Sequence, residues 1–282
     1  MGLYKKIMVA IDNSEESWHA LKEALTIIKN KDTWAVIVTV APQYTGDLGL
    51  ILNDVYEKMI RPYQNLLERA KDLLQKERVL SKFILEEGEP YEKIVDLIYV
   101  ENCDLVIMGR TGSGLKRLLL GSTAARVIGY SPVDVLIIPF RGSVNWKKIL
   151  VPMDQSSYAE RAFFKALELS KLYNGEIYLL SVIDLPVEAI AEAPQLYEKA
   201  AEKFKKYLQE MVDKASSQGI KCEAYVEAGD PAEKILALAE DKEVGVIAMG
   251  SYGKTGLKRV LMGSVTEKVI SLGDKPVLVV KN

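Results

Sequence analysis

The sequence predicts an α/β protein made of two tandem domains, each an open five-stranded parallel sheet with helices on both faces. The first observation is a repeat: Tyr4-Lys-Lys-Ile-Met-Val-Ala-Ile-Asp12 returns as Trp146-Lys-Lys-Ile-Leu-Val-Pro-Met-Asp154, and Gly88-Glu-Pro returns as Gly229-Asp-Pro. The second is the alternation of short apolar runs with longer segments of helical spacing. A repeat spaced about 141 positions apart is of domain length, so it indicates two copies of one domain.

The strands are predicted from unbroken runs of Val, Ile and Leu, which are typical of parallel strands buried on both faces. In the first half they cover residues 7–11, 35–40, 82–85, 105–108 and 135–138. In the second half they cover residues 149–153, 177–183, 221–226, 244–249 and 277–280.

The helices are predicted from apolar periodicity and from start signals. Residues 14–28 and 157–172 have helical spacing, and residues 53–77 and 194–217 suit exposed amphipathic helices. Pro90 and Pro231 suit a first helical position, and Asp230 with Glu233 forms a capping-box pattern. The polar stretch 141–145 is the expected linker, so the predicted domains are residues 1–141 and 146–282.

Composition limits the function classes. The chain has 282 residues, 49% of them hydrophobic and 27% charged, with a net charge of −2. This balance gives no electrostatic reason to expect a nucleic-acid partner or an anionic membrane partner. Cys103 and Cys222 are isolated, so we expect no disulfide framework, no metal site and a cytoplasmic location.

The strongest functional signal is a pair of glycine loops, residues 109–121 and 250–263, each placed between a predicted strand and a predicted helix. Glycines let backbone N–H groups approach an anion, and a helix N-terminus adds the positive end of its dipole. Lys254, Lys258 and Arg259 could balance phosphate charge. The second loop is not a Walker loop, because Ala248 stands where the leading glycine belongs.

Structural interpretations of the same residues stay open. Ser264, followed by Glu267, has the pattern of a residue that only caps a helix. Asp12 and Asp154 could be turn or cap residues before the first helix of each half. His19 has no second histidine or carboxylate pattern around it, so we expect a structural or solvent-facing role.

At these residues the chain resembles the universal stress protein family in its tandem two-domain form. The family pattern is a glycine, two residues, a glycine, nine residues, then glycine and Ser or Thr. Gly250, Gly253 and Gly263-Ser264 match it completely. In the first half, Gly112 and Gly121 have only eight residues between them, so that domain carries an altered loop.

The resemblance implies the strand order 3-2-1-4-5 and an adenine-nucleotide ligand, ATP or AMP, with accompanying Mg²⁺ left open. It implies a stress-response regulatory function with an unidentified protein partner. It also implies an intrachain pseudo-dimer through the fifth strands, and association into a homodimer stays open. The binding residues it implies in the second domain are Asp154, Val182, Met249, Gly250, Gly253, Gly263, Ser264 and Val265. The matching second candidate site is Asp12, Val40, Met108, Gly109, Gly112, Gly121, Ser122 and Thr123.

Two other functions stay open. One is a slow ATPase, although no complete Walker loop and no obvious catalytic carboxylate is found, so at most weak hydrolysis is expected. The other is a protein-interaction scaffold that uses neither site.

Overall fold

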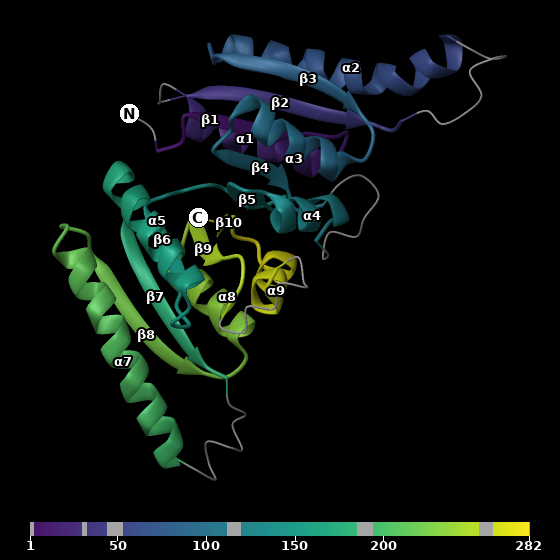
Figure 1. The fold of residues 1–282 in the computed structure, drawn as a ribbon. Helices are drawn as coiled ribbons and strands as arrows, with labels where there is room; N and C mark the ends of the chain where they lie inside the picture. The colour runs from purple at the N-terminus through teal and green to yellow at the C-terminus, as the bar shows by residue number, and fades with distance from the viewer. Residues whose placement is uncertain are drawn as a thin grey trace. The chain divides into compact units, whose positions relative to one another are not determined.

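The computed structural model describes residues 3–29, 33–43, 53–111, 120–184, 194–253 and 262–281. The chain forms two compact units, Met1–Phe140 and Arg141–Asn282 (Figure 1). The boundary between the units lies at the start of the predicted linker.

The first unit alternates strands and helices. Its elements are β1 (Lys6–Ala10), α1 (Glu15–Ile28), β2 (Trp34–Ala41), α2 (Asn53–Lys76), β3 (Ser81–Glu87), α3 (Pro90–Glu101), β4 (Leu105–Gly109), α4 (Ser122–Tyr130) and β5 (Asp134–Ile138).

The second unit repeats this order. Its elements are β6 (Lys148–Pro152), α5 (Ser157–Tyr173), β7 (Glu176–Ile183), α7 (Pro194–Ser216), β8 (Cys222–Ala228), α8 (Pro231–Asp241), β9 (Val246–Gly250), α9 (Ser264–Leu272) and β10 (Val277–Val280).

The strands of each unit are parallel and follow one order. In the first unit it is β3-β2-β1-β4-β5, and in the second it is β8-β7-β6-β9-β10. Ile7 pairs with Leu105 across β1 and β4, and Ile149 pairs with Val246 across β6 and β9. The predicted α/β class is confirmed. In each unit the first and fourth strands are neighbours. The second and third strands lie on one side of this pair and the fifth strand on the other, and open α/β sheets bind ligands where the strand order reverses in this way.

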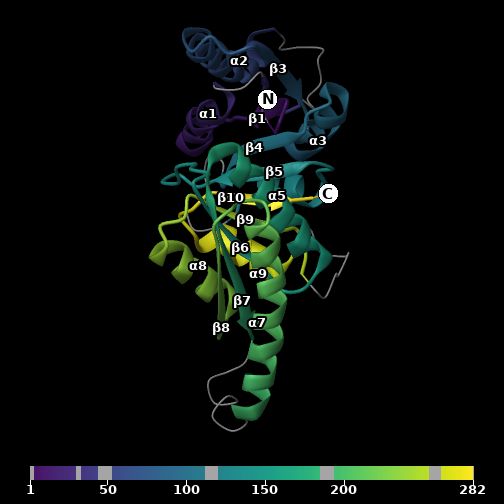
Figure 2. The ribbon, with the colours of Figure 1, turned by 90° about the vertical axis from the view of Figure 1, so that its left-hand side faces the viewer.

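Helices cover both faces of the strands, as expected when right-handed crossovers follow a strand order that reverses direction after β3 and after β8. Figure 2 shows α1 and α2 on one side of the first unit's strands and α3 on the other. In the second unit, α7 packs along β7 and β8. The core is formed by strand residues without solvent exposure, such as Ile7, Ile107, Ile149 and Ile247.

The helix starts confirm part of the sequence analysis. Pro90 and Pro231 are the first residues of α3 and α8, and the Asp230 side chain accepts a hydrogen bond from the Glu233 N–H at 3.1 Å. The N-caps of α1 and α5 are Ser14 and Ser156, so the capping interpretation of Asp12 and Asp154 is wrong.

Candidate functional site

The second unit has a cavity of about 400 Å³ where β6 and β9 end side by side. Asp154 follows β6 by two residues, and Gly250 is the last residue of β9. Every residue predicted for the second domain's site lines this cavity. The lining residues are Pro152, Met153, Asp154, Ala159, Leu180, Val182, Asp184, Phe204, Pro231, Ile235, Met249, Gly250, Tyr252, Gly253, Gly263, Ser264, Val265 and Thr266.

Asp154 is held by a tight turn. Its Oδ1 accepts a hydrogen bond from the Ser156 N–H at 2.9 Å, and the Ser156 hydroxyl in turn accepts from Ala159 N–H at 3.1 Å. A Cβ added to Gly253 would lie 2.9 Å from Asp154 Oδ2. The glycine therefore lets the loop pass directly against the carboxylate, which joins two residues that are far apart in the sequence.

The opposite wall is the N-terminus of α9. Gly263 is its N-cap, with extended backbone (φ −68°, ψ 144°), and among the described residues no side chain caps the helix. The Gly263 N–H donates to Ser251 O at 2.8 Å, which fixes where the helix begins. The first N–H groups of a helix have no intrahelical acceptor, so this wall offers donors and the positive end of the dipole.

This geometry corrects the capping interpretation of Ser264. Because Gly263 is the N-cap, Ser264 is the first helical residue, and its hydroxyl is not the cap that the Ser-x-x-Glu pattern suggests. The next turn is tied to β9 by Thr266, whose hydroxyl donates to Gly250 O at 3.1 Å.

Part of the cavity lining is apolar. Leu180 and Val182 of β7, Phe204 of α7 and Ile235 of α8 form it. Sequence reasoning missed Phe204 and Tyr252. The amphipathic pattern of residues 194–217 predicts a helix, but it does not say which apolar side chain reaches the strand ends.

Tyr207 of α7 lies near the Asp154 and Glu160 carboxylates of the second unit. Burial raises the pKa of the Tyr207 phenol, and the carboxylates of Glu160 and Asp154 raise that pKa further. The phenol therefore keeps its proton at neutral pH, and it donates to Glu160 Oε1 at 3.4 Å.

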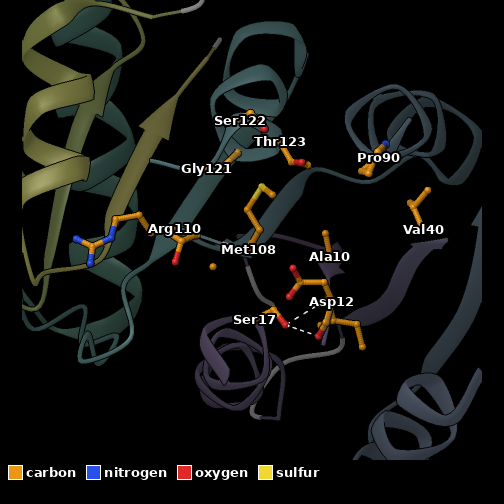
Figure 3. Close-up of a pocket in the computed structure, with 14 residues that line it drawn as sticks. Ala10, Asp12, Ser17, Val40, Pro90, Met108, Arg110, Gly121, Ser122 and Thr123 are labelled. Carbon is orange, nitrogen blue, oxygen red and sulfur yellow. Dashed lines mark hydrogen bonds between the residues drawn. The ribbon is translucent and has the colours of Figure 1, made fainter. Parts of the chain in front are cut away.

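The first unit has a smaller cavity, about 290 Å³, at the matching position (Figure 3). Its lining contains all the residues predicted for the first site except Gly112, which lies outside the described residues. The lining residues are Ala10, Ile11, Asp12, Ser17, Val40, Pro90, Met108, Gly109, Arg110, Thr111, Gly121, Ser122, Thr123 and Ala124. Figure 3 shows Met108 between the Asp12 turn and the start of α4.

Local hydrogen bonds in the first cavity match those of the second. Asp12 Oδ1 accepts from the Ser14 N–H at 3.0 Å, as Asp154 does from Ser156. Gly121 is the N-cap of α4, and its N–H donates to Arg110 O at 2.9 Å. The two cavities therefore share the same backbone frame.

Glu16 distinguishes the first cavity and was also missed by the sequence analysis. Its side chain is buried, and its carboxylate accepts hydrogen bonds from the Thr111 hydroxyl, from the Thr111 N–H at 3.2 Å and from the Phe140 N–H at 3.0 Å. Arg110 Nε lies 3.7 Å from Glu16 Oε1. The carboxylate thus supports the start of the glycine loop from behind.

The remaining sequence expectations concern His19, the basic residues of the second glycine loop, metal ligands and membrane-spanning helices. His19 packs against Phe140 with ring centroids 6.1 Å apart, which agrees with a structural role. Lys254, Lys258 and Arg259 lie outside the described residues. In the ranges that the structure describes, no three His, Cys, Asp or Glu side chains are grouped to hold a metal ion, and no helix is long and apolar enough to cross a membrane.

Comparison with known proteins identifies the family. A model of the universal stress protein family matches residues 3–139 and again residues 145–281. The chain belongs to the universal stress protein family. As a tandem universal stress protein it carries the domain twice, once in each unit.

Single-domain relatives match one half of this universal stress protein. Universal stress protein MJ0577 of Methanocaldococcus jannaschii is 38% identical over 157 residues, covering 49% of this chain and 97% of the relative. Universal stress protein MJ0531 of the same organism is 37% identical over 144 residues, covering 50% of this chain and 85% of the relative.

The fold of the whole chain also has a solved counterpart. A universal stress protein from Archaeoglobus fulgidus superposes with a TM-score of 0.74 at 24% identity, covering 98% of this chain and 96% of that one. At this identity the similarity supports the fold alone.

Proposed function

We propose that the second unit binds an adenine nucleotide, ATP or AMP, and that this universal stress protein passes the bound state to a protein partner. The observation that carries the proposal is the meeting of Asp154, Gly253 and the N-terminus of α9 in one cavity. Its volume of about 400 Å³ is in the range of small-molecule pockets.

The phosphates are assigned to the α9 end of the cavity. Gly263, Ser264 and Val265 present a helix N-terminus there, and backbone N–H groups with the helix dipole favour an anion. The Ser264 hydroxyl adds a donor, because Gly263 rather than Ser264 is the N-cap.

The base is assigned to the end formed by Asp154 and the apolar part of the lining. Val182 and Phe204 supply surface against which a flat ring can pack. A carboxylate accepts a hydrogen bond from the 6-amino group of adenine, whereas a guanine in the same position would present its 6-carbonyl, a second acceptor, to the carboxylate. Asp154 is therefore proposed to select adenine.

The first test is to denature freshly purified protein and to identify any released nucleotide by mass and amount. We expect at least one adenine nucleotide per chain, because the complete glycine loop is in the second unit. Absence of nucleotide, followed by no uptake of ATP or AMP at millimolar concentration, would reject the proposal and favour the scaffold function.

Matched variants locate the site. Asp154→Ala should weaken ATP binding about 10- to 100-fold, which corresponds to a lost hydrogen bond to a charged group. Asp12→Ala should leave this binding unchanged, because Asp12 belongs to the other cavity. Titration calorimetry with ATP and GTP measures both effects; equal ATP affinity in the Asp154→Ala and Asp12→Ala chains would contradict the assignment.

A pair of variants, Gly263→Val and Gly263→Ala, tests the assignment of the phosphates to the α9 end of the cavity. An added Cβ at Gly263 would meet its nearest neighbours, Gly253 N and Tyr252 Cα, at 3.5 Å, which is ordinary contact. The alanine should therefore fold and bind, whereas the branched valine should obstruct the anion and abolish binding. Binding retained by Gly263→Val would place the phosphates elsewhere.

A further inference from the structure

The two cavities differ in the residue behind the start of the glycine loop. Glu16 is the second residue of α1, and Tyr158 is the second residue of α5, so they occupy equivalent positions. The backbone of each lies against the glycine that ends the unit's fourth strand, Gly109 of β4 for Glu16 and Gly250 of β9 for Tyr158.

In the first unit the support is a buried negative charge. Glu16 is 4% exposed, and its carboxylate takes both donors of Thr111, the N–H and the hydroxyl. Thr111 lines the cavity. These two donors are therefore already used and are not offered to an anionic ligand, and the carboxylate is one hydrogen bond behind the cavity wall.

The positive charge of Arg110 does not replace the negative charge of Glu16 on the side that faces the cavity. Its Nε lies 3.7 Å from Glu16 Oε1, and Figure 3 shows its guanidinium group pointing away from the cavity. The cavity wall at Thr111 therefore faces the carboxylate side of the pair.

In the second unit the support has no negative charge. The Tyr158 ring packs edge-on against Tyr252, with centroids 5.5 Å apart, and Tyr252 lines the cavity. The guanidinium carbon of Arg161 lies 4.6 Å from the centre of the Tyr158 ring. A neutral ring with a cation behind it thus stands where the first unit has a carboxylate.

We propose that Glu16 is a specificity-determining residue that makes the first cavity select against polyphosphates. The first unit then takes adenosine or a nucleoside monophosphate in preference to ATP, whereas the second unit accepts ATP. A fixed carboxylate near the phosphate end repels a ligand in proportion to its negative charge. This inference rests on the proposed function, because it assumes that both cavities take adenine nucleotides.

The test measures the first unit in the full chain with the second site blocked by Gly263→Val. Adenosine, AMP, ADP and ATP are titrated into this chain with and without Glu16→Gln. With Glu16 present, affinity should fall from AMP to ATP. Glu16→Gln should tighten ATP binding about tenfold and adenosine binding less than twofold, and the difference should shrink at high ionic strength.

A reciprocal pair in the second unit keeps the test decisive if Glu16→Gln does not fold. Tyr158→Glu and Tyr158→Gln both remove the ring, but only the first adds a charge. The glutamate variant should bind ATP about tenfold more weakly than the glutamine variant, with equal affinity for adenosine. A purely structural role would change all four ligands alike.

The outcomes separate this inference from the proposed function. If the unmodified second unit takes up no nucleotide, the proposed function fails. If it binds ATP but Glu16→Gln changes all ligands equally, or the first unit binds none of the four with either residue, the Glu16 inference alone is rejected.

Discussion

The two units start their glycine loops on the same backbone frame but support them with different chemistry. In both, the N-cap glycine of the last helix donates to the residue that follows the fourth strand (β4 or β9), Gly121 to Arg110 and Gly263 to Ser251. Behind that frame the first unit buries the Glu16 carboxylate, and the second packs Tyr158 on Tyr252. The difference teaches that a duplicated fold can change the charge at its site without changing its strands.

The largest expected effect comes from removing the buried support of the first unit. Glu16→Ala would leave the Thr111 and Phe140 N–H groups and Arg110 without this acceptor, so we expect a loss of about 3 kcal/mol in the stability of that unit. Tyr158→Ala should cost the second unit less, about 1–2 kcal/mol, since it mainly loses an aromatic pair and some burial.

Native-state hydrogen exchange measures this comparison, because the amides of β4 and β9 report on one unit each. A loss of less than 1 kcal/mol in β4 for Glu16→Ala, or an equal loss for both variants, would show that the carboxylate is not the main support of its loop.

The next effect concerns the glycine that ends the fourth strand of each unit, β4 or β9. A Cβ at Gly250 would lie 2.6 Å from Tyr158 Cβ and 2.7 Å from its carbonyl carbon, whereas at Gly109 the nearest atoms are Ser17 N at 3.1 Å and Glu16 C at 3.2 Å. Gly250→Ala should therefore destabilise the second unit by about 3 kcal/mol, and Gly109→Ala the first by about 1 kcal/mol.

Thermal unfolding of the two single variants tests this order. If Gly109→Ala is the more damaging, α1 is held more rigidly against β4 than the distances indicate, and the contrast between the units would be reversed.

The smallest expected effect is a difference between the units in how their stability depends on pH. Hydrogen bonds from Lys82 and Lys6 lower the pKa of the Glu101 carboxyl, whose side chain is 8% exposed; the contacts are 2.6 and 3.0 Å. Because the folded-state pKa is below the unfolded one, this stabilisation is present at neutral pH. It is lost as the pH falls below about 4 through the folded pKa.

Glu101→Gln should thus lower the stability of the first unit by about 1 kcal/mol at pH 7 and by progressively less in acid. The second unit has Lys242 at the matching position, so Lys242→Gln is the control and should not change the acid dependence of the first unit. Hydrogen exchange of the β4 amides from pH 3 to 7 makes the comparison; a stability loss from Glu101→Gln that is constant with pH would contradict it.

Much of the frame was predictable because it depends on local pattern. Buried Val and Ile runs mark the strands, and the tenth strand, Val277–Val280, was predicted at its observed ends. Others differ by one or two residues, since β9 begins at Val246 rather than at position 244. The repeat itself located Asp12, Asp154 and the glycines at equivalent strand ends.

The helix start at Ser264 shows where local pattern fails. A Ser followed three residues later by Glu fits an N-cap, and it fits a first helical residue equally well. The choice depends on the hydrogen bond from the Gly263 N–H to Ser251 O, a contact between segments on either side of the glycine loop.

The sequence by itself determined two α/β copies, the order of their elements and the glycine and aspartate positions at the strand ends, because these follow from repetition, from unbroken apolar runs and from the helical period of 3.6 residues. Only the tertiary structure decided that Glu16 is buried behind one loop, and that Phe204 reaches the cavity beside Asp154. The reason is physical: these arrangements depend on how α1 packs on β4 and how α7 packs on β7 and β8, and no local period along the chain encodes which side chains meet there.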